Sequence, residues 1–210
     1  MSMLKDRLNK HFATAAVAVA ASMGAAHQAS AAIVSSGPVN IVIPDNIDGI
    51  YMNVVTGATG TTGAVAGWDI NPYSAVVGQF NLWGPTTTTW FSTGGVIGGP
   101  YNLPAATAIG GPDTGFFRPG GGTNVGLELA LNSSNNLFGF RFVNEANANL
   151  VHFGWIRLAA GATAGERAIV EYAYESEAGV SIGAGVVPTP GAAAMFGAAG
   201  LLVARRRRSV

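Results

Sequence analysis

The chain has 210 residues, of which 30 are Gly and none is Cys, so disulfides, thiol catalysis and zinc–thiolate sites are excluded. The first ten residues are basic, and a cluster of four Arg lies near the C-terminal end. The chain between them has four other Arg and ten acidic residues, which gives a net charge of about −6. Such an acidic body lacks the cationic surface that neutralises phosphates, which excludes nucleic-acid binding.

The first 31 residues have the three parts of a secretory signal peptide. Lys5, Arg7 and Lys10 precede the apolar run FATAAVAVAASMGAA, and the small residues Ala29-Ser30-Ala31 follow it. We expect signal peptidase to cleave after Ala31. Residues 32–185 then form one exported domain, and residues 186–210 form a separate C-terminal signal.

The first half of the exported domain contains three predicted strands, at 39–43, 50–55 and 76–83, separated by long loops rich in Gly, Pro and Thr. The segment 45–49, DNIDG, offers oxygen ligands of the kind that Ca²⁺ accepts, but its spacing differs from that of an EF-hand loop. Asp, Asn and Gly are also ordinary turn formers. We therefore predict a turn here, with no metal and no cofactor in the protein.

Aromatic residues beside polar ones lie near the predicted loops. Trp68 is followed by Asp69, and Trp90 stands in Thr89-Trp90-Phe91. A ring offers a flat apolar face to a sugar, and carboxylates bind its hydroxyls, so Trp68, Asp69 and Trp90 are candidate glycan contacts. The alternative is that these rings fill the core of the domain.

The second half alternates apolar and other residues with a period of two, which is typical of half-buried strands. The predicted strands are 125–131, 137–143, 151–158 and 167–175, with turns at 133–136, 144–149 and 160–166. On the last strand we expect Ala168, Val170, Tyr172 and Tyr174 on one face, and Arg167, Glu171 and Glu175 on a charged outer face.

Together these patterns predict an all-β fold. We expect an antiparallel two-sheet β-sandwich, jelly-roll-like, flanked by an N-terminal signal helix and a C-terminal transmembrane helix.

Residues typical of catalysis are sparse. Ser181 stands in a G-x-S-x-G pattern, but the following residues cannot begin a helix and His152 precedes the Ser, unlike in serine hydrolases. The alternation places His152 opposite Val151 and Phe153, as a structural residue. The acids Glu128, Glu145, Glu171 and Glu175 form no compact motif. We predict that the protein is not an enzyme; the alternative is a carbohydrate-active hydrolase that uses a Glu pair.

The C-terminal segment combines prolines, a short apolar stretch and a basic end. The 14 residues between Pro190 and Arg205 would form a helix of roughly 21 Å, shorter than a comfortable membrane span of about 30 Å. The cluster Arg205, Arg206, Arg207 and Arg208 holds the adjacent end in the cytoplasm. These features predict temporary residence in the membrane followed by processing.

Val187-Pro188-Thr189-Pro190, the apolar stretch and the Arg cluster resemble the PEP-CTERM sorting signal of Gram-negative bacteria, with Thr189 where that signal usually has Glu. The resemblance implies removal of the tail by an exosortase-type membrane peptidase and delivery to the cell surface or exopolysaccharide matrix. Residues 138–158 and 167–175 are also similar to a segment of secreted proteins that carry this signal. That second resemblance implies an exported β-domain and no particular activity.

The sequence therefore predicts an exported, non-enzymatic protein with a structural or adhesive role at the cell surface or in the matrix. The expected partners are signal peptidase, the exosortase-type enzyme, the membrane in passing, and extracellular polysaccharide.

Overall fold

The computed structural model describes residues 32–77, 79–92, 102–110, 116–119, 123–124 and 129–187. These residues form β-strands, turns and loops, and none of them is in a helix. The strands are β1 (Ile33–Ser35), β2 (Ile41–Val42), β3 (Tyr51–Met52), β4 (Thr59–Gly60), β5 (Asn71–Tyr73), β6 (Asn81–Trp83), β7 (Thr89–Ser92), β8 (Ala108–Ile109), β9 (Phe116–Pro119), β10 (Thr123–Asn124), β11 (Ser133–Asn144), β12 (Leu150–Ala160), β13 (Arg167–Glu175) and β14 (Ile182–Gly183). The prediction of an all-β, antiparallel fold is confirmed.

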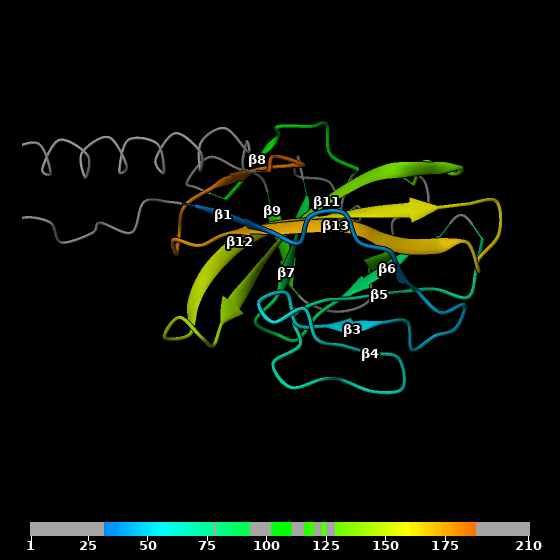
Figure 1. Ribbon diagram of the computed structural model, residues 1–210, viewed down its shortest axis with the longest axis horizontal. Coiled ribbons are helices and arrows are strands. Elements are labelled where there is room, and N and C mark those ends of the chain that lie inside the picture. Colours follow the sequence, from blue (N-terminus) through cyan, green and yellow to red (C-terminus); the bar gives the residue numbers. More distant parts are fainter. Residues whose placement is uncertain are drawn as a thin grey trace, which may run out of the picture. The chain divides into compact units, whose positions relative to one another are not determined.

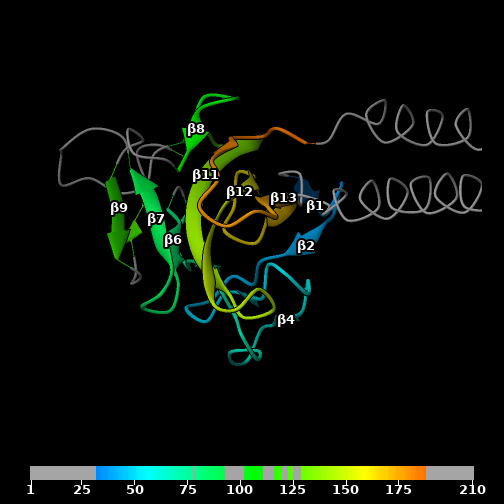
Figure 2. The ribbon, with the colours of Figure 1, turned by 90° about the vertical axis from the view of Figure 1, so that its left-hand side faces the viewer.

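One seven-stranded antiparallel sheet, called the main sheet here, organises the body. Its order is β1-β13-β12-β11-β7-β9, and β2 also pairs with β13 (Figures 1 and 2). The three long strands β11, β12 and β13 follow one another as hairpins, closed by turns at 145–149 and 161–166. They form an antiparallel meander and account for three of the four strands that the alternating pattern predicted.

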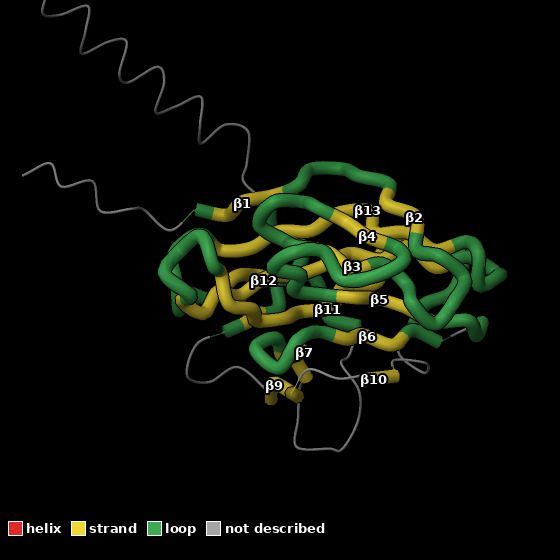
Figure 3. The backbone as a smooth tube through the Cα atoms, turned by 90° about the horizontal axis from the view of Figure 1, so that it is seen from below, coloured by secondary structure: helices red, strands yellow, loops and turns green. Residues whose placement is uncertain are grey.

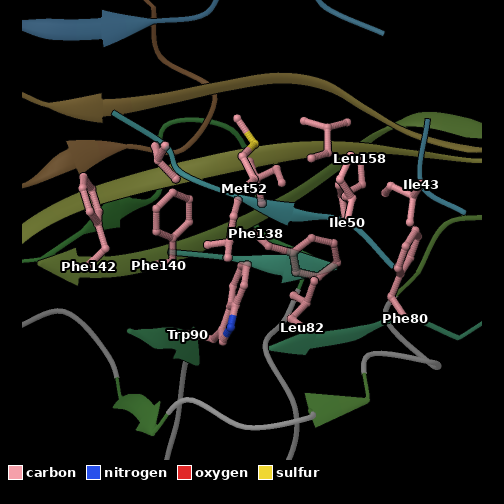
Figure 4. Packing of buried hydrophobic residues seen from close by; sticks show 14 of the residues in the cluster. Ile43, Ile50, Met52, Phe80, Leu82, Trp90, Phe138, Phe140, Phe142 and Leu158 are labelled. Atoms are coloured by element: carbon pink, nitrogen blue, oxygen red, sulfur yellow. The ribbon is translucent and has the colours of Figure 1, made fainter. Parts of the chain in front are cut away.

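The long strands bury side chains on both faces of the main sheet. Phe138, Phe140 and Phe142 point from β11 into a first core cluster. Figure 4 shows their rings among side chains from other strands. Residues of opposite phase, such as Leu137 and Trp155, belong to a second core cluster. The buried alternation therefore continues on both sides of the sheet.

Shorter strands cover these two faces. The first core cluster includes Met52 of β3, Ile70 before β5, and Leu82 of β6. The second includes Ile109 of β8 and Ile182 of β14, which pair with each other. The main sheet is thus covered on both sides by elements from the first half of the chain and its C-terminal end.

A β-bulge in β13 makes one face prediction wrong. Arg157 lies opposite Glu171 and Leu158 lies opposite Ile169, so Val170 is an extra residue without a partner on β12. The phase of β13 reverses there: Ile169 joins Tyr174 in the first core cluster, and Ala168 does not share a face with Tyr172 and Tyr174.

The same bulge buries Arg167, which was predicted on a charged outer face with Glu171 and Glu175. Only 4% of Arg167 is exposed, and its guanidinium donates to the carbonyls of Ser74 and Val76 and lies over the ring of Phe80. Burial lowers the pKa of this guanidinium. Arg167 therefore connects the 74–76 segment to the main sheet through hydrogen bonds.

Several predicted boundaries change. Residues 133–136 were predicted as a turn but belong to β11, and 129–131 form no strand, while 125–128 lie outside the described residues. The predicted strands of the first half shorten to two or three residues each. The predicted helices at 1–31 and 191–204 lie outside the described part of the chain, in which no helix is long and apolar enough to cross a membrane.

Candidate functional site

Three aromatic side chains meet at the surface of the body. Tyr51, Trp68 and Trp83 form a triangle with ring centroids 5.0, 5.2 and 6.0 Å apart and edge-to-face angles of 62 to 81°. Trp83 is 37% exposed, and Tyr51 and Trp68 are partly exposed. We call these three residues the aromatic surface cluster.

The strand periodicity explains why these rings point outward. Met52 of β3 and Leu82 of β6 are fully buried in the first core cluster, so their neighbours Tyr51 and Trp83 face the other way. An isolated bridge between Met52 and Ile70 joins β3 to the start of β5, and β5 pairs with β6 (Figure 3). The chain before Ile70 then brings Trp68 into contact with both rings.

Asn53 fixes the loop that carries Trp68. Its amide nitrogen donates to the carbonyls of Gly67, at 2.6 Å, and Ala66, at 3.3 Å. Its oxygen accepts from the backbone N–H groups of Val55 and Thr56. Because Asn53 is 5% exposed, these bonds are shielded from water and hold the loop closed.

Asp69 follows Trp68 in the chain and is only 2% exposed. Its Oδ2 accepts from the Val54 N–H at 2.8 Å. Burial raises the pKa of Asp69 to about 7; the Val54 bond opposes this shift and the negative charge of Glu145 adds to it. Burial also raises the pKa of Tyr174, with a smaller contribution from Asp69.

The structure separates the three predicted glycan contacts. Trp68 is in the aromatic surface cluster, whereas Asp69 is buried and accepts a hydrogen bond from the Val54 N–H. Trp90 has no exposed surface and packs against Phe140 at 5.6 Å, so it leaves the set of candidate contacts because a ligand has no access to it. Tyr51 and Trp83 replace it. The signal that could have found them is their alternation with Met52 and Leu82.

Two of the acids considered for catalysis, Glu145 and Glu171, lie far apart. Glu171 pairs with Arg157 at 3.3 Å, and Arg157 is seven residues along β12 from its start at Leu150, roughly 23 Å at 3.3 Å per residue. Glu145 lies at that end, in the exposed β11–β12 turn. These two carboxylates are therefore too far apart for glycosidase chemistry, which needs about 5 to 9 Å.

Glu175 and Glu128 are the other two acids considered. Glu175 is buried, and its carboxylate accepts from the Glu177 N–H and the Ser176 hydroxyl. Glu128 lies outside the described residues. The negative charge of Glu145 adds to the raised pKa of Asp69, after the larger effect of burial.

His152 and Ser181 do not come together as a catalytic pair. His152 is fully buried; with the Asn147 amide donating to Nε2 at 3.0 Å, Nδ1 carries the proton and donates to the Glu175 carbonyl at 2.8 Å. Ser181 is exposed just before β14. His152 thus has a structural role, as its position in the alternation predicted.

The 45–49 segment is a turn closed by its own side chain. Asn46 Oδ1 accepts from the N–H groups of Asp48 and Gly49. Within the described ranges, no three His, Asp or Glu side chains lie close enough together to hold a metal ion.

Most residues of the two predicted signals lie outside the described residues: Ala29, Ala31, Pro188, Thr189, Pro190 and Arg205 to Arg208. Val187 is described and is 40% exposed. Comparison with protein-family models, with curated proteins and with solved structures finds no significant match.

Proposed function

We propose that this protein is an exported, non-enzymatic component of the cell surface or extracellular polysaccharide matrix of a Gram-negative bacterium. In this proposal, signal peptidase removes residues 1–31 and an exosortase-type peptidase processes the signal at 186–210. The fold supports it because β1 begins at Ile33 and β14 ends at Gly183, so every described strand lies between the two proposed signals.

The proposal also interprets the body as a β-sandwich related to the jelly roll. The main sheet is one layer, and β3, β5 and β6 are the core of a second layer, with the first core cluster between them. A cysteine-free sandwich with an acidic surface suits a protein that must stay folded and soluble outside the cell.

The observation that carries an adhesive role is the aromatic surface cluster. Tyr51, Trp68 and Trp83 are partly exposed apolar rings that pack edge to face, and a pyranose ring stacks on the exposed face of such a ring. Asn53 and the buried Asp69 hold the Trp68 loop in place before any ligand arrives, so little freedom is lost on binding.

Charge selects the class of polysaccharide. The body between the two signals has a net charge of about −6, and the carboxylate of Glu145 lies beside Gly67, next to Trp68 in the chain. Repulsion disfavours polymers of uronic acids. The ligand in this proposal is therefore a neutral or amino-bearing polysaccharide.

A hydrolase is the alternative function, and one observation favours it. Asp69, with a pKa of about 7, lies in the field of Glu145, which would give one protonated acid and one carboxylate. A substrate would have to reach Asp69 through a movement of the Trp68 loop, because Asp69 is 2% exposed.

Binding of the exported product to three soluble polymers tests the proposal: a neutral glucan, a glucosamine polymer and a polyuronate. We expect affinity for one of the first two, weakened about tenfold, or about 1.4 kcal/mol, in Trp68→Ala and Trp83→Ala. Ile47→Ala is the matched control, since Ile47 is 77% exposed and outside the cluster. Equal binding by all variants would show that the aromatic surface cluster does not bind the polysaccharide. If the wild type releases reducing ends and Glu145→Gln does not, the hydrolase is favoured.

A further inference from the structure

The backbone of Ala32 is tied to the end of β13. Its N–H donates to the Ser176 hydroxyl at 3.2 Å, and its carbonyl accepts from the Ser176 N–H at 3.0 Å. In the pairing of β1 with β13, the next residue, Ile33, lies opposite Glu175. The first residue after the proposed cleavage position is therefore already part of the main sheet.

Glu175 brings a buried carboxylate to the same place. It is 4% exposed, and its Oε1 accepts from the Ser176 hydroxyl at 3.4 Å and from the Glu177 N–H at 3.2 Å. Among the residues that the structure describes, no cationic side chain forms a salt bridge with it. A buried carboxylate without a countercharge is costly, so this position favours a cation.

Processing would supply that cation. Hydrolysis of the Ala31–Ala32 peptide bond consumes one water and leaves a carboxylate on Ala31 and an amine on Ala32. With an ordinary pKa of about 7.7 to 8.0, this amine takes up a proton at neutral pH. The bond from the Ala32 nitrogen to Ser176 Oγ is kept, and the new charge lies one hydroxyl group away from the Glu175 carboxylate.

We propose that the end of β13 is a binding site for the N-terminal ammonium group of the processed chain, with Ser176 as acceptor and Glu175 as countercharge. This inference rests on the proposed export and cleavage. Its consequence is that the processed body is more stable than the precursor, in which the same nitrogen is a neutral amide.

The composition makes the site directly measurable. Both Lys residues, Lys5 and Lys10, lie in the signal peptide, so the α-amine is the single primary amine of a chain that begins at Ala32. The full chain is produced with its own signal peptide, and the N-terminus of the exported product is read by mass spectrometry. Acetylation by an N-hydroxysuccinimide ester then reports on this amine alone.

We expect the native exported product to be acetylated about tenfold more slowly than the Glu175→Gln variant, the effect of one unit in the pKa of the amine. Glu177→Gln is the matched control: it removes a neighbouring charge from an exposed side chain and should leave the rate as in the wild type.

A second variant keeps Glu175 and moves the amine. An alanine inserted between Ala31 and Ala32 leaves the cleavage motif intact and displaces the amine by one residue. We expect fast acetylation and a lower melting temperature. If the native product begins at Ala32 but reacts as fast as Glu175→Gln and the insertion variant, this inference is wrong while export stands. A product that does not begin at Ala32 overturns the inference together with the proposed cleavage.

Discussion

Gly154 of β12 lies opposite Phe140 of β11, and the Phe140 ring occupies the space that a side chain at position 154 would need. A Cβ on Gly154 would lie 2.8 Å from Phe140 Cζ. On the other face, Gly139 lies opposite Trp155, and its missing Cβ leaves room for Ile109 and Phe91. The Gly residues of the Phe-Gly-Phe and Phe-Gly-Trp sequences therefore make room for neighbouring side chains: Gly154 for the Phe140 ring, and Gly139 for Ile109 and Phe91.

Gly154→Ala should therefore destabilise the body by about 1–3 kcal/mol, because the added methyl group overpacks the first core cluster. Gly165→Ala is the matched control, since a Cβ there meets nothing within 4 Å and its backbone is not left-handed. Urea unfolding of both variants checks this. A Gly154→Ala variant as stable as Gly165→Ala would show that the Phe140 ring moves aside freely.

The meander could be predicted because its alternation is long and unbroken on β11 and β12. The bulge at Val170 could not, because one inserted residue leaves the composition of β13 unchanged and reverses only its phase. Residues 133–136 read as a turn, yet the Asn136 side chain bonds the backbone of Ala130 and Leu158 and joins β11 to its surroundings. Tertiary hydrogen bonds overrode the turn propensity of Asn.

Arg157 of β12 and Arg167 of β13 both lie near the bulge, and they should differ in their contribution to stability. Arg167→Met removes buried hydrogen bonds to the carbonyls of Ser74 and Val76, and we expect a loss of about 3 kcal/mol. Arg157→Met removes a partly exposed ion pair with Glu171, at a cost of less than about 1 kcal/mol. Chemical denaturation of the two variants measures the difference, and equal losses would contradict the assigned role of Arg167.

The stability of the body should depend on pH through Asp69. Its pKa is raised from 3.8 to about 7 on folding, so the folded state binds one proton more than the unfolded state between these values. The contribution is fully present below pH 4 and is lost as pH rises to about 7, a change of up to about 4 kcal/mol.

Asp69→Asn tests whether stability falls as pH rises, because the neutral amide resembles the protonated carboxyl group and still accepts from the Val54 N–H. We expect the variant to match the wild type near pH 4 and to be more stable near pH 8, in urea unfolding across this range. Asp48→Asn, at an exposed turn position, should follow the wild-type curve. A variant that is less stable than the wild type at pH 8 would show that ionised Asp69 stabilises the fold.

The candidate site was predicted only in part. Trp68 follows from the adjacent Asp69, but Trp90 also comes directly after polar residues, the Thr run 86–89, and only the three-dimensional packing shows that it is in the core. Tyr51 and Trp83 are 32 residues apart in the chain. Both contact Trp68 because β3 is bridged to the start of β5 and β5 pairs with β6. The local alternation shows that Tyr51 and Trp83 face outward, but not which distant strands come together.

The central claim is that the acidic β-body is exported and processed at both ends. Cell fractionation of the producing bacterium, followed by intact-mass measurement, tests it most directly. The account predicts a surface or extracellular species that begins at Ala32 and lacks Arg205 to Arg208. A full-length species in the cytoplasm, with Met1 and the four arginines still present, would contradict it.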